Sequence, residues 1–346
     1  MSSGAMVALL KTAPRAHRRR VAVVLNTNAR RVDGETLGWV RAVVPSGDLF
    51  VSRTRADGVR IADSLISEGV DAVLFGGGDG TFAAGVAALA QAAERRGAPL
   101  PDVGVLRLGT GNAVAQTIGA APATPAGLAG DLRRARAHAS RRALALLEVE
   151  GRPTMFAGFG LDAQILEDLG QTLALLDQAG LAGAVRSANL RYLLSVTSRS
   201  IPRFVMAERA EVVAVNRGAP ALTIDVDGNP IGAPIPAGRV LWRGHASLAA
   251  VSSVPYYGLA MKMFPHAEKL PGRFQVRLSD LGAAEILLRL PALWKGRCES
   301  PRIHDFLCDE VELIMSRPSP FQSGGDLLGE RGRVTIGRWR RPVAVV

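Results

Sequence analysis

Four glycines and one aspartate lie in a run of six residues, Gly76 to Thr81, directly after the apolar segment 71–75. Glycine permits positive φ and lets backbone amides approach a ligand without a Cβ in the way. A helix that begins near Thr81 adds its N-terminal amides and its dipole at the same point, which suits a polyanion. The residues expected to bind nucleotide phosphates are therefore Gly77, Gly78, Gly80 and Thr81.

The acid within this run, Asp79, would repel phosphate unless Mg²⁺ lies between them or the carboxylate takes a proton from the acceptor. An aspartate among phosphate-binding glycines therefore favours metal-assisted phosphoryl transfer, with Asp79 in a catalytic role and in contact with the metal of Mg-ATP. The plainer alternative is a tight strand-to-helix turn in which Asp79 caps the helix.

A second glycine loop follows the apolar segment 103–106 and precedes a predicted helix, 113–118. Carboxyl ends of parallel strands meet at one edge of a sheet, so both loops are expected at the edge where α/β folds bind ligands. Asn26, at the end of the first apolar segment, would flank the nucleotide there. The second loop contributes the candidate nucleotide-binding residues Gly109, Thr110, Gly111 and Asn112, whose hydroxyl and amide groups suit phosphate or adenine.

Other nucleotide and hydrolase motifs are excluded. The chain has no lysine between Lys11 and Lys262, so neither a Walker-type nor a protein-kinase lysine can serve these loops. The loop at 109–114 lacks the third small residue of a dinucleotide fingerprint, and no acid follows at the expected distance. A GxSxG nucleophile elbow is also absent from the sequence.

The elements that must position these loops change character along the chain. Short apolar runs at 21–25, 71–75 and 103–106 alternate with helical patterns at 59–68 and 82–96, which is typical of a parallel sheet in an open α/β domain. The stretch 120–130 is expected to be a loop. After residue 143 the strand-like segments are separated by Gly- and Pro-rich connections; they are 144–149, 211–215, 221–226, 247–251, 274–278, 310–315 and 333–336.

These patterns predict an α/β fold of two domains: a Rossmann-like N-terminal nucleotide-binding domain and a mostly-β sandwich. The expected divisions are a disordered basic arm (1–19), the α/β domain (20–142), a β-rich lipid-acceptor domain (143–332) and a C-terminal segment (333–346) that returns to the first domain. One helical block, 166–195, interrupts the β-rich part.

The formal net charge of +11 comes almost entirely from arginine. Either it is a compositional bias, or it reflects an anionic partner, for which we expect peripheral contact with an anionic membrane surface rather than nucleic acid. No apolar run is long enough to cross a membrane, and the two cysteines form no metal-ligand spacing, which fits a reducing cytoplasm. A homodimer is left open.

The segment from Phe75 to Phe82 resembles the GGDGT signature of the diacylglycerol kinase catalytic domain superfamily, which includes bacterial lipid kinases and sphingosine kinases. Val105 to Ala113 is similar to its second signature, PLGTGN, in the same order and spacing. Asn26 stands where the family has Asn-Pro. Looser resemblances within residues 20–340 are Phe159–Ala163, Tyr257-Gly258, Pro265–Ala267, Pro320–Gln322 and Gly324–Asp326.

This resemblance implies an enzyme that uses ATP and Mg²⁺ to transfer the γ-phosphoryl group to a lipid hydroxyl, of diacylglycerol or a sphingoid-like base. It implies that the acceptor lies between the two domains, and it makes Asp79 and Asp326 the candidates for activating the acceptor hydroxyl.

The sequence departs from the family at several positions. Arg107 replaces a proline, Ala113 replaces an aspartate common in bacterial members, and residues 271–275 lack the acids of a bacterial metal-site segment. The family's Asp-Gly-Glu has become Gly324-Gly325-Asp326, with a shorter carboxylate. Two alternatives stay open. An NAD-kinase-like enzyme shares the GGDG loop, although the loop at 109–112 argues against it, and a catalytically weak nucleotide- or lipid-binding homologue is suggested by the changes at Pro271 and Gly324.

Overall fold

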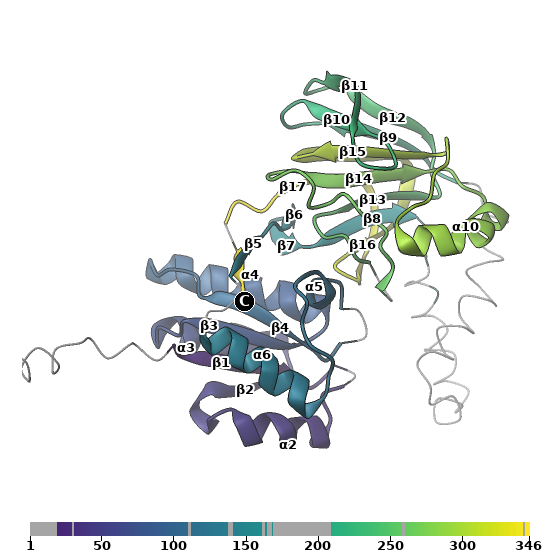
Figure 1. The fold of residues 1–346 in the computed structure, drawn as a ribbon. Helices are drawn as coiled ribbons and strands as arrows, with labels where there is room; N and C mark the ends of the chain where they lie inside the picture. The colour runs from purple at the N-terminus through teal and green to yellow at the C-terminus, as the bar shows by residue number, and fades with distance from the viewer. Residues whose placement is uncertain are drawn as a thin grey trace, which may run out of the picture.

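A six-stranded sheet organises the first part of the chain, in the order β2-β1-β3-β4-β18-β5 (Figure 1). The computed structural model describes residues 19–346 except 30, 110–111, 138–140, 161–162, 165–167, 169–208, 258–259 and 342. The predicted arm up to residue 18, and the predicted helical block apart from residue 168, lie outside these described residues. The strands are β1 (Val21–Asn26), β2 (Leu49–Ser52), β3 (Ala72–Gly77), β4 (Asp102–Arg107), β5 (Arg142–Leu144) and β18 (Val343–Val345).

The first four strands of this sheet are parallel, which confirms the predicted α/β fold. Helices α3 and α4 pack on one face, against Val73 and Phe75 of β3, and helices α2 and α6 pack on the other, against Ala72 and Leu74. Both faces are buried because side chains alternate along a strand, so β3 is apolar at every position before its glycines. The helices are α2 (Gly34–Val43), α3 (Arg55–Ser67), α4 (Asp79–Arg96), α5 (Ala113–Thr117) and α6 (Pro125–Ala137).

The second part of the chain is β-rich, as predicted, and its strands join in one twelve-stranded sheet. The long strand β16 pairs with β9 along its first half and with β8 near its end, so the sheet bends and encloses an apolar core. The strands are β6 (Leu147–Val149), β7 (Arg152–Thr154), β8 (Phe156–Gly160), β9 (Glu211–Asn216), β10 (Ala221–Ile224), β11 (Pro230–Ile235), β12 (Val240–His245), β13 (Leu248–Ser252), β14 (Phe274–Ser279), β15 (Ile303–Cys308), β16 (Glu310–Ser323) and β17 (Asp326–Arg338).

The two sheets are in contact beside α4. Met155, Phe156 and Val254 of the second domain are buried in the same apolar cluster as Phe82 and Val86 of α4. Arg142 also forms an ion pair with Glu268, with 3.3 Å between Nη1 and Oε1. The chain returns to the first sheet through β18. Residues 333–338 belong instead to β17, which pairs with β16 and β6 of the second sheet. The domain boundaries at 142/143 and 332/333 stay predictions.

Several predicted elements were wrong. The stretch 120–130 is not a loop throughout, because α6 begins at Pro125, where the fixed φ of proline suits a first helical position. The segment 144–149 divides into β5 and β6, which belong to different sheets. The Pro-rich segment at 230–235 is an exposed strand at the sheet edge, where proline needs no partner for its missing N–H. A further helix, α10 (Ala283–Lys295), was not predicted.

Candidate active site

The first glycine loop lies where β3 ends and α4 begins. Gly78 is the N-cap of α4 and provides no side-chain cap, so the helix starts at Asp79, earlier than predicted. The first-turn amides of a helix have no carbonyl partner within the helix, and they carry the positive end of its dipole. The loop therefore offers an uncapped helix N-terminus at the carboxyl edge of the sheet, as a phosphate group requires.

None of the four glycines of this loop adopts positive φ, and two of them, Gly76 and Gly77, are needed for space. A Cβ on Gly76 would lie 2.3 Å from Cδ2 of Leu25, and a Cβ on Gly77 would lie 2.4 Å from Oγ1 of Thr81. Real Cβ atoms do not approach other atoms so closely. The expected positive-φ role is thus replaced by close packing of the strand end against β1 and against the first turn of α4.

Asn26 lies beside this loop, as its position at the end of β1 predicted. Its Nδ2 donates to Oγ1 of Thr81 at 2.9 Å, and its Oδ1 accepts from the amide of Asn28 at 3.0 Å. Asn26 therefore fixes the Thr81 hydroxyl at the start of α4 and also holds the turn that follows β1.

Asp79 joins the two glycine loops. Its Oδ2 accepts from the amide of Ala113 and its Oδ1 from the amide of Val114, both at 3.0 Å, so it caps α5 and not its own helix. Only 6% of Asp79 is exposed. Burial raises the pKa of its carboxyl, while the hydrogen bonds from Val114 and Ala113 act in the opposite direction. Both carboxylate oxygens are thus engaged within the protein.

In the second loop, Asn112 is the N-cap of α5 and is 9% exposed. Its Nδ2 donates to the carbonyl of Gly109 at 2.8 Å, while its buried Oδ1 has no hydrogen-bond partner among the described residues. A buried acceptor of this kind favours a ligand donor nearby. Thr110 and Gly111 lie outside the described residues.

Asp326 comes from the other domain and meets the first loop. Its Oδ2 and Oδ1 lie 3.7 and 3.9 Å from the point that a Cβ on Gly80 would occupy. Asp326 is exposed, and in the described part of the chain no hydrogen bond or ion pair is recorded for its carboxylate. The structure therefore brings together Gly80 and Asp326, two predicted site residues that are far apart in the sequence.

The turn that carries Asp326 depends on two glycines. Gly324 (φ 61°) and Gly325 (φ 88°) join β16 to β17 as a two-residue hairpin loop, with Ser323 opposite Asp326. Positive φ at both central residues defines a type I′ turn, which glycine adopts without strain. The change from Asp-Gly-Glu to Gly-Gly-Asp therefore keeps a well-formed hairpin.

A buried glutamine supports the same turn. Gln322 is fully buried, its Oε1 accepts from the amide of Gly325 at 3.2 Å, and its Nε2 donates to the hydroxyl of Tyr257 at 2.6 Å. Gln322 and Tyr257 thus connect the hairpin to the β13–β14 connection, which packs Tyr257 on Phe156 with 4.6 Å between ring centroids.

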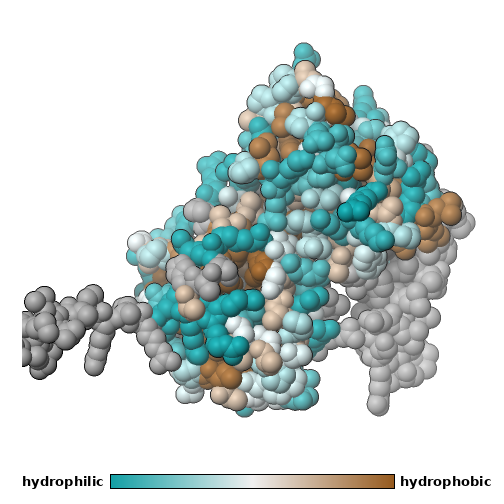
Figure 2. Space-filling model, viewed as in Figure 1, coloured by the Kyte–Doolittle hydropathy of each residue, from teal (hydrophilic) through white to brown (hydrophobic). Residues whose placement is uncertain are grey.

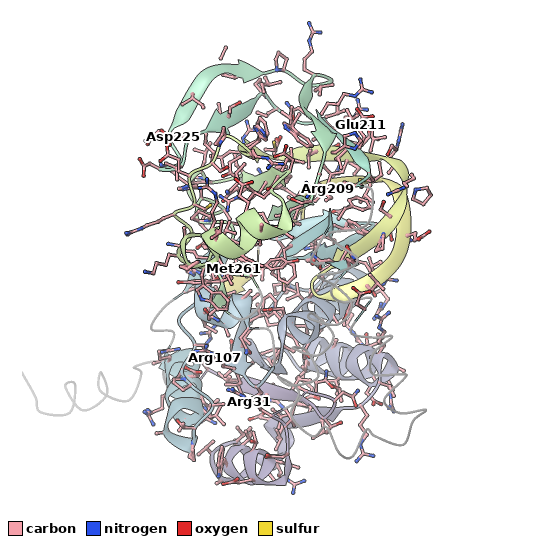
Figure 3. The ribbon with its side chains drawn as sticks, turned by 90° about the vertical axis from the view of Figure 1, so that its right-hand side faces the viewer. Arg31, Arg107, Arg209, Glu211, Asp225 and Met261 are labelled. Atoms are coloured by element: carbon pink, nitrogen blue, oxygen red, sulfur yellow. The ribbon has the colours of Figure 1, made fainter. Side chains whose placement is uncertain are left out.

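Two cations at the carboxyl edge were missed from the sequence. Arg107 ends β4, where it is paired in register with Gly77, and the amide of Arg31 donates to the carbonyl of Leu108 at 3.2 Å. Figure 3 labels both on the side of the first domain turned to the viewer. Neither side chain has a recorded ion pair within the described residues. The signal in the sequence is Arg107 itself, an arginine at the end of a strand in a chain that has no lysine nearby.

The described residues contain no group of three or more His, Cys, Asp or Glu side chains that could hold a metal ion. They also contain no helix that is both long and apolar enough to cross a membrane.

Residues 20–143 match the family model of the diacylglycerol kinase catalytic domain. A solved diacylglycerol kinase from Bacillus anthracis str. Sterne is 15% identical, with a TM-score of 0.61 and coverage of 95% of this chain and 96% of that chain. Another structure from that organism, of a protein provisionally assigned as a diacylglycerol kinase, is 17% identical, with a TM-score of 0.63 over 95% and 97% of the two chains. At these identities the structures establish a shared fold.

An NAD kinase from Archaeoglobus fulgidus, solved in complex with ATP, is 11% identical, with coverage of 94% and 92% and a TM-score of only 0.43. No curated protein matches the sequence. The match over residues 20–143 is the one that the two glycine loops predicted, and the chain has the two-domain fold of the two Bacillus anthracis structures.

Proposed function

We propose that this protein is a lipid kinase, which transfers the γ-phosphoryl group of ATP to the hydroxyl of a lipid such as diacylglycerol or a sphingoid base. The observation that carries the proposal is the position of Asp326 against Gly80. It brings a carboxylate of the β-rich domain to the helix N-terminus where phosphates would bind, which is the arrangement needed to act on an acceptor held between the domains.

The groups present at the carboxyl edge fit a nucleotide. The uncapped first turn of α4 suits the terminal phosphates, and Arg107 and Arg31 supply the positive charge that the missing lysine would provide in other kinases. The unpartnered Oδ1 of Asn112 would accept a hydrogen bond from the nucleotide. The protein therefore offers amide donors, cations and one free acceptor around a single edge of the sheet.

Magnesium fits as part of Mg-ATP rather than as a metal caged by the protein, because the described residues hold no metal-binding cluster. When bound, Mg²⁺ would neutralise charge on the phosphate oxygens. Both oxygens of Asp79 already accept amide hydrogen bonds, so we assign Asp79 to holding the two loops together. The carboxylate of Asp326 is assigned to the acceptor hydroxyl.

In the proposed reaction, the Asp326 carboxylate takes the proton of the acceptor hydroxyl as that oxygen forms a bond to the γ-phosphorus. The bond between the γ-phosphorus and the bridging oxygen breaks, and ADP leaves. The amides of the first turn of α4 hold the transferring group in place, and Asn26 keeps the Thr81 hydroxyl oriented beside it.

An acceptor panel tests this proposal. The full chain would be incubated with [γ-³²P]ATP, Mg²⁺ and mixed micelles containing diacylglycerol or sphingosine, and separately with NAD. We expect label in the organic extract with one lipid class and none in NAD. Label transferred to NAD alone would favour the NAD-kinase-like alternative. Nucleotide binding without transfer to any acceptor would favour the weakly active homologue.

A further inference from the structure

Helix α10 presents apolar side chains to solvent, although a helix on the surface of a domain normally buries its apolar face. Leu288 is 84% exposed, Leu287 57% and Trp294 40%. These three residues, with the partly exposed Leu290, are here called the α10 face. The helix lies at the edge of the second domain in Figure 1, where brown residues also gather in Figure 2.

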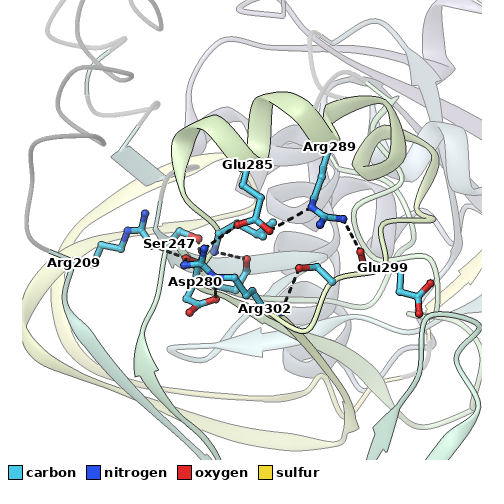
Figure 4. A network of polar contacts seen from close by, with 10 residues as sticks. Arg209, Ser247, Asp280, Glu285, Arg289, Glu299 and Arg302 are labelled. Atoms are coloured by element: carbon cyan, nitrogen blue, oxygen red, sulfur yellow. Dashed lines mark hydrogen bonds and ion pairs between the residues drawn. The ribbon is translucent and has the colours of Figure 1, made fainter.

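The polar side of α10 is turned toward the protein and fixed there by ion pairs (Figure 4). Glu285 pairs with Arg302, with 2.8 Å between Oε2 and Nη1, and with Arg289 at 3.3 Å. Arg302 also pairs with Asp280 at 3.0 Å, and Arg289 donates to the carbonyl of Glu299 at 2.8 Å. The helix is therefore held in the orientation that leaves its leucines and tryptophan outside.

Three cations surround the C-terminal end of the α10 face. Lys295 and Arg297 flank Gly296, the C-cap of the helix, and the backbone of Lys262 lies beside them because its amide donates to the carbonyl of Trp294 at 2.9 Å. No ion pair is recorded for these three side chains within the described residues. Exposed leucines and a tryptophan next to unpaired cations are the composition of a helix that binds at a membrane surface.

We propose that the α10 face docks on a membrane whose surface carries anionic phospholipid. Leu287, Leu288 and Trp294 would enter the boundary between headgroups and acyl chains, while the three cations would contact lipid phosphates. Charge complementarity favours a membrane over a second copy of this chain, whose α10 face would bring the same cations together. The inference deepens the proposed lipid kinase function and depends on it only for the identity of the acceptor.

The α10 face is linked to the candidate active site by a short series of hydrogen bonds. Lys262 is bonded to Trp294 as described above, and the amide of Tyr257 donates to the carbonyl of Met261 at 2.8 Å. Tyr257 in turn binds Gln322, which supports the turn of Asp326. Figure 3 shows Met261 just below α10, on the side of the second domain that faces the first. Docking through α10 would thus hold the acceptor-bearing membrane near the Asp326 turn.

Vesicle co-sedimentation tests the proposal without ATP or acceptor. The wild-type chain would be mixed with vesicles of phosphatidylcholine alone, or with a third of the lipid replaced by phosphatidylglycerol. We expect binding to the anionic vesicles that weakens with salt, and a loss of at least about tenfold in the L287E/L288E double variant. The matched control is the V43E/V59E double variant, which adds the same two charges at apolar positions on α2 and α3 that are 38% and 44% exposed, and which should bind as the wild type does.

Tryptophan quenching locates the contact. Brominated lipid should quench the fluorescence of wild-type protein, and Trp294→Phe should remove most of that quenching while it leaves co-sedimentation nearly intact. Equal binding by wild type and L287E/L288E, or equal quenching in Trp294→Phe, would overturn the proposal. So would a wild-type dimer that L287E/L288E converts to monomer, because a second copy would then cover the face. If vesicle binding holds but no lipid is phosphorylated in mixed micelles, only the proposed kinase function fails.

Discussion

The Asp326 carboxylate lies against Gly80, with Oδ2 3.7 Å from the point where a Cβ of that glycine would be. Gly80 belongs to the first turn of α4 in the parallel-sheet domain, and Asp326 follows the β16–β17 turn in the β-rich domain. A phosphoryl group held by the amides of that turn would have a carboxylate from the other domain beside it. The proposed turnover depends on this contact.

Gly325→Ala tests whether the turn positions Asp326. Its φ of 88° is strained for alanine, although no atom lies within 4 Å of the added Cβ, so we expect a loss of about 1 kcal/mol in unfolding free energy. The control is Gly232→Ala, which has φ of 69° and equally open space in the β11 strand, away from the site. Urea unfolding should show similar losses for both variants, while only Gly325→Ala lowers kcat. Equal kcat values in the two variants would show that the turn does not position the carboxylate.

Asp79→Asn should weaken the connection between the glycine loops. An amide at this position can accept only one of the two hydrogen bonds from Ala113 and Val114, which leaves a buried donor unpaired and costs about 1–3 kcal/mol. We expect a raised KM for ATP together with lower stability in urea. Asp131→Asn is the control, because Asp131 is equally buried and accepts the amide of Ala121, away from the loops.

The outcome for Asp79 also separates its two candidate roles. A role as proton acceptor predicts that Asp79→Asn lowers kcat while stability and the KM for ATP stay at wild-type values. The hydrogen bonds to α5 predict the opposite pattern, in which stability and nucleotide affinity change first.

Arg107→Ala should weaken ATP binding, because it removes a cation at the end of β4 beside the phosphate loop. The loss of one charge-assisted contact to phosphate corresponds to roughly a tenfold rise in the Kd for ATP. The measurement is isothermal titration with Mg-ATP at low and high salt, with Arg239→Ala, an exposed arginine in the β-rich domain, as control. If Arg107→Ala binds ATP as tightly as the control does, Arg107 has no place in the nucleotide site.

A pH prediction concerns the start of α3. Amide hydrogen bonds from Arg53 and Thr54 hold the pKa of the Asp57 carboxyl well below its usual range. Because the folded-state pKa is depressed, this contribution is present above the unfolded pKa and is lost as pH falls toward the folded value. Asp57→Asn should therefore lower the Tm at pH 7, and the difference from wild type should shrink below about pH 4. A difference that is the same at both pH values would contradict this assignment.

Much of the first domain could be predicted because its signals are local. Helix α4 is Ala-rich and ends at Arg96, and Gly97 adopts the left-handed C-cap conformation that glycine favours. The strand ends could be assigned because the apolar runs stop at a polar residue or glycine, namely Asn26, Gly76 and Arg107. Asn26, Asp79 and Asn112 therefore meet at the predicted edge of the sheet.

The rest depends on contacts that leave no local pattern. The sequence does not indicate whether Asp79 accepts hydrogen bonds from the first amides of α5 or from those of its own helix, α4, because a carboxylate can cap either helix. Helix α10 was missed because Pro291 lies inside it, and proline usually ends a helix. Most of its leucines are also exposed, so the segment lacks the pattern of a helix that buries its apolar side. The position of Asp326 beside Gly80 follows from the packing of Met155 and Phe156 against α4, which only tertiary structure reveals.

The rate of phosphoryl transfer by Asp326→Asn tests the central claim most directly. Single-turnover transfer from saturating Mg-[γ-³²P]ATP to the lipid acceptor would be compared among wild type, Asp326→Asn and Asp227→Asn, an exposed aspartate in the turn between β10 and β11. We predict that Asp326→Asn binds ATP normally but transfers about 10²–10⁴-fold more slowly, while Asp227→Asn matches wild type. Transfer by Asp326→Asn at the wild-type rate would contradict the proposed role of Asp326 and the assembly of the site from both domains.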